Sequence, residues 1–151
     1  MIRSLALFQV PTNRDWSIRQ DPADLDNYSR DVSIVQGAPE AILMPRDRGD
    51  ICDALAWACA EGIAVLPVGG LTSTTGASVA KEGLVIDLRP LAGEVVIDAE
   101  RGLATASAGT CLAELRDAAR AHGWELPCDP TSIDDCTLGG AIACNASGPA
   151  T

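Results

Sequence analysis

A strand–helix–strand pattern over residues 41–66 constrains the fold of this chain more than any other feature. Residues 41–44 and residues 63–66 are short apolar runs, and a proline follows each of them. Between them, residues 47–61 have the apolar spacing of a helix, with Asp47 placed to cap the first turn and a glycine after the last. Two strands joined by a helix pair in parallel, so the pattern predicts a layered α+β domain.

Further elements are predicted on both sides of this unit. Residues 84–88 predict a strand, and residues 94–98 and 103–108 predict two more strands joined by a tight turn. A second helix is predicted over residues 111–122, and the polar residues 1–30 predict an irregular N-terminal arm. The inner faces of the two helices are expected to carry Ile51, Leu55, Ala58 and Cys59 in the first and Leu112, Leu115, Ala118 and Ala119 in the second.

The formal net charge of −10 argues against several classes of partner. Nucleic acids and anionic membrane surfaces are bound by clustered Lys and Arg, which are not found here. No apolar run approaches the roughly 20 residues of a membrane span, and the apolar patch at residues 5–8 is too short for a signal sequence. We therefore expect a cytoplasmic protein without a membrane span. A phosphate ligand is compatible with the charge if backbone N–H groups bind it.

The six cysteines include no C-x-x-C pair, so the spacings of zinc and iron–sulfur sites are absent. We expect the cysteines to be small buried hydrophobic side chains in a reducing compartment. Cys128 and Cys136, which flank a small-residue segment, are the candidates for exceptions. The only histidine, His122, is expected to lie in solvent at the end of the second helix, where a cation is favourable.

Residues 68–78, here called the first glycine-rich loop, directly follow a predicted strand. They contain three glycines, a run of four Thr and Ser residues and no charged side chain. Glycine lets the backbone approach a ligand, and successive N–H groups can form a nest for phosphate oxygens. No lysine follows the glycines, so this is not a Walker A loop, and the Rossmann pattern is also absent. A tight structural turn is the alternative interpretation.

Residues 129–148, here called the second glycine-rich loop, end in a stretch of very small side chains from Thr137 to Gly148. This composition suits a backbone that is pressed against a flat ligand or against another backbone. Asn145 can both donate and accept hydrogen bonds, so it could hold the edge of a ring or a ribose. A tightly packed helix of small residues is the alternative. The pair Asp134-Asp135 is interpreted as a solvated turn, not as a catalytic dyad.

Together, the two loops resemble the FAD-linked oxidase family, which has the vanillyl-alcohol oxidase or PCMH type of FAD-binding domain. The resemblance covers about residues 28–148, and the chain looks most similar to D-lactate, glycolate and other D-2-hydroxy-acid dehydrogenases. The matching residues are Tyr28, Asp31-Val32-Ser33, Pro39-Glu40-Ala41-Ile42, Pro45, Pro67-Val68-Gly69-Gly70-Leu71-Thr72-Ser73, Gly76, Asp87-Leu88, Asp98, Ala108-Gly109, Gly123, Pro130, Thr137-Leu138-Gly139-Gly140 and Asn145-Ala146-Ser147-Gly148.

The resemblance implies an α+β fold of two small α/β subdomains that hold FAD between them. The implied boundaries are an arm at residues 1–30, a first subdomain at 31–92 with a pyrophosphate loop at 67–78, and a second subdomain that starts at 93 and is incomplete at 151. FAD contacts are implied for Gly69, Gly70, Leu71, Thr72, Ser73, Gly76 and Ser78 in the first loop and for Pro130, Thr131, Thr137, Gly139, Gly140, Asn145, Ser147 and Gly148 in the second. The first loop has no histidine of the kind to which some members attach FAD, which implies non-covalent binding.

For the whole enzyme, the resemblance implies oxidation of a small 2-hydroxy acid, such as D-lactate or glycolate, by hydride transfer to flavin N5. A substrate domain that is missing from this chain would supply the acid and base groups, so no catalytic residue and no metal ligand is assigned here. A partner subunit or an iron–sulfur or other electron-acceptor protein could complete the enzyme. Two alternatives stay open: a non-catalytic FAD-binding subunit that needs a partner chain, and an unrelated α/β module for another phosphorylated ligand.

Overall fold

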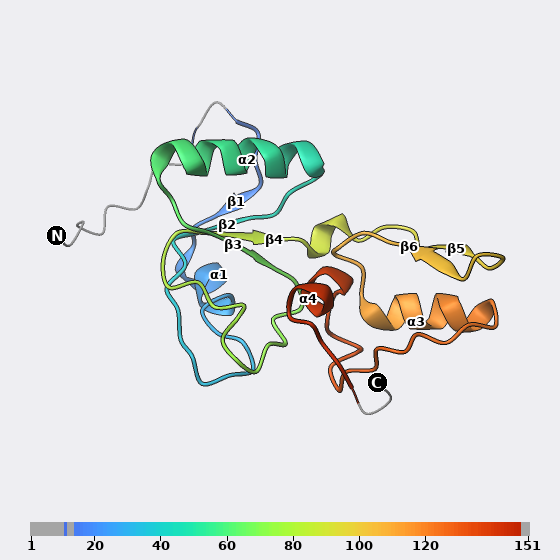
Figure 1. Cartoon of the computed structure of the whole chain (residues 1–151). Helices are drawn as coiled ribbons and strands as arrows, with labels where there is room; N and C mark the ends of the chain where they lie inside the picture. Colours follow the sequence, from blue (N-terminus) through green and yellow to red (C-terminus); the bar gives the residue numbers. More distant parts are fainter. Residues whose placement is uncertain (1–10, 12–13, 149–151) are drawn as a thin grey trace.

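Two sheets, with the short 3-10 helix η1 between them in the chain, organise the fold (Figure 1). The computed structural model describes residue 11 and residues 14–148. The larger sheet has the strand order β1-β2-β4-β3, and β5 and β6 form a separate sheet. The elements in chain order are β1 (Ile18–Arg19), α1 (Pro22–Asn27), β2 (Ala41–Leu43), α2 (Arg48–Glu61), β3 (Val65–Val68), β4 (Leu84–Asp87), η1 (Arg89–Leu91), β5 (Val96–Asp98), β6 (Leu103–Thr105), α3 (Leu112–Ala121) and α4 (Leu138–Ala143).

The larger sheet is built around β4, because β2 and β3 both pair with it in parallel. The two strands of the strand–helix–strand pattern are therefore parallel within one sheet, as predicted, but they do not pair with each other, because β4 lies between them. The side chains of β4 alternate between the two faces, so Leu84 and Ile86 pack beneath α2 while Val85 packs with Tyr28 on the opposite face. Figure 1 shows α2 on one side of the sheet and α1 on the other. Burial of a side chain such as Leu84 contributes about 1.5–3 kcal/mol to folding.

The helix α2 begins and ends where the sequence predicts, but only part of its predicted inner face lies against the sheet. Asp47 caps its first turn, and a glycine with a φ of 67° ends it. The predicted inner face is confirmed for Ala58, which is buried, and for Ile51, which packs against the core beneath the helix. It is wrong for Leu55 and Cys59, which are exposed, while Ala54 is buried against the sheet. Two alanines one turn apart let the helix backbone lie close to the strands, which a leucine at the interface would prevent.

The strand β3 spans Val65–Val68, two residues later than the predicted 63–66. Pro67 therefore lies inside the strand and does not end it; its register partner is Ile86 of β4. A proline has no N–H to donate to a neighbour, and β3 is the last strand of its sheet. An edge strand tolerates this loss because one side of its backbone needs no ladder partner.

The expectation of an irregular N-terminal arm is wrong for residues 18–27, which form β1 and α1. The strand β1 pairs with β2 in the antiparallel direction and extends the sheet. Asp21 caps α1, since its carboxylate accepts a hydrogen bond of 2.9 Å from the N–H of Ala23, and Pro22 fills the first turn. Residues 1–10, 12 and 13 of the predicted arm lie outside the described residues.

The second half of the chain forms a smaller layer of a hairpin and two helices. The predicted hairpin is confirmed, although β5 and β6 are shorter than expected. The predicted inner stripe of α3 is confirmed for Leu112, Leu115 and Ala119, which are buried, while Ala118 is half-buried. In the described part of the chain, no helix has the length and apolar character needed to cross a membrane.

All six cysteines lie in the described region, and all are free thiols. Cys136, a candidate exception, is buried like a small hydrophobic side chain, and Cys128 is half-buried, but Cys52, Cys59 and Cys144 are exposed. The expectation of buried cysteines is therefore wrong for these three. Cys52 and Cys59 lie on the solvent side of α2, whereas helical periodicity had placed Cys59 on the inner side.

Candidate functional site

A cavity of about 340 Å³ lies between the two glycine-rich loops. Its volume is within the range of small-molecule sites. The first loop contributes residues 69–75 and Ser78 to the wall, and the second contributes residues between Pro130 and Ser147. Among the residues that the structure describes, no Asp, Glu, Lys, Arg or His lines the cavity. The fold thus brings two segments that are far apart in sequence to one uncharged pocket.

The two loops touch directly, and Gly69 and Gly70 make this contact possible. A Cβ atom added at Gly69 would lie 2.0 Å from the hydroxyl oxygen of Thr137, and one added at Gly70 would lie 2.0 Å from the carbonyl oxygen of Asp135. Both distances are far shorter than any real contact of a Cβ atom. The glycines are therefore required for the approach of one loop to the other, which is a different reason from the approach to a ligand that we inferred from the sequence.

The first loop presents a run of backbone donors with no protein partner. In the described part of the chain, the N–H groups of the six residues from Gly69 to Thr74 donate to no protein acceptor. All six residues line the cavity. Backbone N–H groups in proteins are nearly always paired, so these donors must be satisfied by water or by a ligand. Successive free N–H groups form the kind of concavity that binds phosphate oxygens.

Hydrogen bonds to Ser73 hold the remainder of the first loop in its conformation. The side-chain oxygen of Ser73 accepts hydrogen bonds from the N–H groups of Thr75, at 3.2 Å, and Ala77, at 3.1 Å. The carbonyl oxygen of Ser73 accepts a further bond of 3.1 Å from the N–H of Val32. The loop conformation is therefore held in place without using the free N–H donors of residues 69–74.

Asp31 supports the same loop from outside, and sequence reasoning had given it no role. Its carboxylate accepts hydrogen bonds from the N–H of Ser33, at 2.8 Å, and from the N–H of Ser78, at 3.4 Å. Partial burial would raise the pKa of Asp31, but hydrogen bonds from Ser33, Ser78 and Ser73 outweigh it and lower the pKa. A signal for this role was present in the sequence, because Asp31 and Ser33 fit the pattern of an Asx turn.

Two residues in strained backbone conformations also line the cavity. Leu71 has a φ of 57° and Asn145 has a φ of 49°, and they are the only non-glycine residues with positive φ in the described part of the chain. Asparagine adopts this region readily, whereas leucine does so at a cost of about 1–2 kcal/mol. Such strain persists where surrounding contacts impose it, and it gathers at functional sites.

The second loop contains a short helix, α4, whose first turn is capped by Thr137. The Thr137 hydroxyl accepts a hydrogen bond of 3.3 Å from the N–H of Gly140, and Thr137 is buried. The N–H of Leu138 donates to the carbonyl of Thr110 at 2.8 Å, which ties α4 to the start of α3. The stretch is therefore a packed helix of small residues, which was the alternative interpretation, and it also forms a wall of the cavity.

Most of the sequence-predicted site residues lie at the cavity. Four do not line it: Gly76, Thr131, Gly139 and Gly148. Gly76 has a φ of 81°, and Gly148 lies so close to the backbone of Asp129 that a Cβ atom would be 1.7 Å from its carbonyl oxygen. Structural contacts thus account for these glycines. The lining residues that the sequence reasoning missed are Thr74, Thr75, Ser132, Cys136, Ala141, Cys144 and Ala146.

The ionisable groups near the loops do not form a catalytic pair. His122 lies exposed at the end of α3, where its Nδ1 is 2.9 Å from the carbonyl oxygen of Ala118. Asp134 and Asp135 are exposed turn residues. Burial raises the pKa of the Cys136 thiol, which disfavours a reactive thiolate at neutral pH. The described residues contain no group of His, Cys, Asp and Glu side chains that could hold a metal ion.

Known proteins share both the sequence and the fold of this chain. The chain is 36% identical over 149 residues to a D-2-hydroxyglutarate dehydrogenase of Xanthomonas citri pathovar viticola, an alignment that covers 97% of this chain and 31% of the relative. It is 32% identical to a D-lactate dehydrogenase of Archaeoglobus fulgidus, covering 84% of this chain and 29% of that protein. A solved structure of an alkyldihydroxyacetonephosphate synthase matches with a TM-score of 0.75 at 23% identity, covering 87% of this chain and 27% of that one.

These relatives are much longer proteins, and the chain matches only the smaller part of each. The likeness to the synthase structure shows a shared fold, because its sequence identity is low. The profile of one protein family, described as "FAD binding domain", matches residues 39–151. This range includes both glycine-rich loops and the cavity between them. The chain therefore belongs to this family of FAD-binding domains, which has the PCMH-type fold.

Proposed function

We propose that this chain holds FAD in the cavity between its two glycine-rich loops, and that it serves an oxidoreductase acting on a D-2-hydroxy acid. The observation that carries the proposal is the run of six free N–H groups from Gly69 to Thr74, in a cavity that the described residues line without a charged side chain. In a protein with a net charge of −10, neutral donors are a suitable means of binding an anionic cofactor.

The residues present fit the diphosphate of FAD and the groups beside it. The free N–H groups of the first loop would donate to the phosphate oxygens, together with the hydroxyl of Thr72, which lines the cavity. Across the cavity, Asn145 and Ser147 offer side-chain donors and acceptors to the sugar or ring atoms. When bound, FAD supplies the redox chemistry by accepting a hydride equivalent from the substrate. The protein then has to bind, orient and shield the cofactor.

Non-covalent attachment is part of the proposal. The only histidine, His122, is at the end of α3 and does not line the cavity. We therefore expect acid precipitation of the loaded protein to release all the flavin into the supernatant. Flavin that remained with the precipitated protein after washing would contradict this expectation.

The names of two relatives support the substrate class, since they are a D-2-hydroxyglutarate dehydrogenase and a D-lactate dehydrogenase. The fold does not decide the substrate, because the solved synthase of the same fold has a different name and activity. No lining residue is an acid or base suited to substrate oxidation. We propose that another domain or a partner chain supplies these groups and that FAD is this chain's contribution.

The test uses the flavin-loaded protein isolated from the cells that produce it, so that any chain it needs is retained. Under anaerobic conditions, D-2-hydroxyglutarate or D-lactate should bleach the oxidised-flavin band at about 450 nm, and the L-enantiomers should not. Bound flavin that no D-2-hydroxy acid reduces would overturn the substrate proposal and favour a non-catalytic FAD-binding subunit. Protein that binds no FAD at all would overturn the cofactor assignment.

A further inference from the structure

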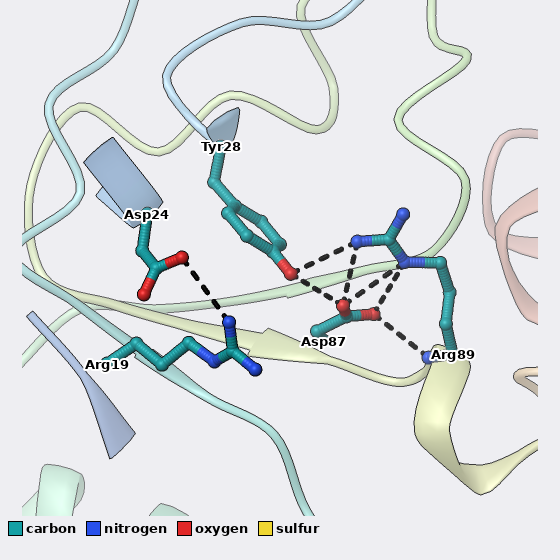
Figure 2. A network of polar contacts seen from close by, with 5 residues as sticks. All are labelled: Arg19, Asp24, Tyr28, Asp87 and Arg89. Atoms are coloured by element: carbon teal, nitrogen blue, oxygen red, sulfur yellow. Dashed lines mark hydrogen bonds and ion pairs between the residues drawn. The ribbon is translucent and has the colours of Figure 1, made fainter. Parts of the chain in front are cut away.

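A buried ionic network lies at the end of β4, next to the start of the first glycine-rich loop (Figure 2). The Tyr28 hydroxyl donates to the Asp87 carboxylate at 2.7 Å. The Arg89 guanidinium donates to both oxygens of Asp87, at distances of 2.8 to 3.1 Å, and to the Tyr28 oxygen at 3.1 Å. Asp87 is 1% exposed, whereas the Arg89 side chain is 44% exposed.

The position of Asp87 in the sheet places its charge beside the start of the first glycine-rich loop. Asp87 is the register partner of Val68, the residue that immediately precedes Gly69. Neighbouring strands lie about 4.8 Å apart, so Asp87 is close to the first free N–H group. Tyr28, Val68 and Leu71 pack in one cluster on this face of the sheet, and Leu71 lines the cavity.

The buried Asp87 carboxylate would repel an anion bound by the first loop unless a cation compensates its charge. In the described part of the chain, Tyr28 and Arg89 are the titratable groups that act on Asp87. We propose that Arg89 is a positioning residue that acts through Asp87. It compensates the buried carboxylate beneath the first loop, so that the loop can bind an anionic cofactor. This inference rests on the proposed function.

The protonation equilibria of the network agree with this role. Burial by itself would raise the pKa of Asp87, but the hydrogen bonds and charge of Arg89 outweigh burial and lower it, so the carboxylate is ionised. Burial and the contact with Asp87 raise the pKa of Tyr28, so the phenol remains a neutral donor. The three side chains together therefore carry no net charge near neutral pH.

The experiment measures the dissociation constants of FAD and of inorganic pyrophosphate for the full chain from about pH 5 to pH 8. In Arg89→Gln, FAD should bind about tenfold more weakly near pH 8. The uncompensated Asp87 carboxylate would repel the phosphates of FAD, and nearby unit charges interact substantially in a protein. The affinity should recover towards pH 5, where the uncompensated Asp87 takes up a proton. The double variant Asp87→Asn with Arg89→Gln should recover the wild-type affinity at both pH values. Arg19→Gln is the matched control, since its 3.3 Å pair with Asp24 is exposed (Figure 2).

Recovery in the double variant supports the proposal, and a double variant that binds as weakly as Arg89→Gln overturns it. If Arg89→Gln alone does not fold, the double variant must fold and bind FAD normally, or the proposal fails. If the wild-type protein binds pyrophosphate but not FAD, and the variants change pyrophosphate affinity as expected above, the proposed function is contradicted but the role of Arg89 is supported. If all variants bind FAD equally well, the role of Arg89 is contradicted but the proposed function is supported.

A second readout needs no cofactor, because Tyr28 is the only tyrosine in the chain. Its ionisation can be followed by near-ultraviolet absorbance in the cofactor-free protein. Asp87→Asn should lower the pKa of Tyr28 and Arg89→Gln should raise it further, since these changes remove a nearby anion and a nearby cation. A Tyr28 pKa that neither change moves would show that the network does not form, and the proposal would fail.

Discussion

At the scale of single residues, the glycines of the first loop show how a ligand site depends on contacts within the protein. Gly70→Val should abolish FAD binding and destabilise the fold by about 1–3 kcal/mol, because its side chain would collide with the backbone of Asp135 and separate the loops. Urea unfolding and FAD titration measure the two effects. Gly93→Val is the matched control, since no atom lies within 4 Å of a Cβ atom there. Normal FAD binding by Gly70→Val would contradict the assignment of the first loop.

His122 provides a residue-scale prediction of the opposite kind. It is exposed at the end of α3 and lies away from the cavity. His122→Ala should leave the FAD dissociation constant unchanged and alter the free energy of unfolding by no more than about 0.5 kcal/mol, as is usual for a surface position. A large loss of flavin affinity in this variant would show that the histidine has a part in the site.

At the scale of elements, the cap of α4 links helix stability to the shape of the cavity. Thr137→Ala removes the hydroxyl that accepts from Gly140, which should cost about 1 kcal/mol in the free energy of unfolding and weaken FAD binding. Thr137→Ser keeps the hydroxyl and is the matched control, so it should retain most of both. Equal losses in the two variants would show that the methyl group, which lies close to Gly69, matters more than the cap.

The sequence predicts the elements whose boundaries carry local chemical signals. Asp47 and the glycine after α2 mark that helix correctly, and the parallel direction of β2 and β3 follows from its position between them. That β4 would lie between these two strands could not be predicted from the local pattern. The end of β3 was predicted wrongly because a proline usually indicates the end of a strand. Pro67 lies within β3 because β3 is at the edge of its sheet, which the sequence does not show. The exposure of Leu55 could not be predicted either, since small alanines rather than the largest side chains set the contact with the sheet.

The candidate site is predictable in part for the same reason. Glycine and hydroxyl composition indicates both loops, but not that Gly70 contacts the backbone of Asp135 across sixty-odd residues of chain. The support from Asp31 and the network around Asp87 also depend on tertiary contacts between distant segments. Such contacts leave no periodic pattern in the sequence, so only the structure shows them.

At the scale of the whole molecule, stability should depend on pH through carboxylates with lowered pKa values. Hydrogen bonds from Arg46 lower the pKa of Asp50. A carboxyl with a lowered pKa in the folded state stabilises the fold above its ordinary pKa of about 4, and this contribution is lost as the pH falls through the folded-state value. The free energy of unfolding, measured with urea from about pH 7 to pH 3, should fall steeply at the acid end of this range. Asp50→Asn should make this fall less steep, and an unchanged pH dependence would contradict the role of Asp50.

The cavity proposed to hold FAD is a feature of the whole molecule, because it exists only where the two loops meet. Cys144 is an exposed thiol that lines the cavity, while Cys52 and Cys59 are exposed on α2 and do not line it. The most direct test is therefore the rate at which a thiol reagent alkylates each cysteine, measured by mass spectrometry with and without saturating FAD. We expect FAD to slow alkylation of Cys144 severalfold and to leave the alkylation rates of Cys52 and Cys59 unchanged. Bound FAD that does not protect Cys144, or a chain that binds no FAD, would contradict it.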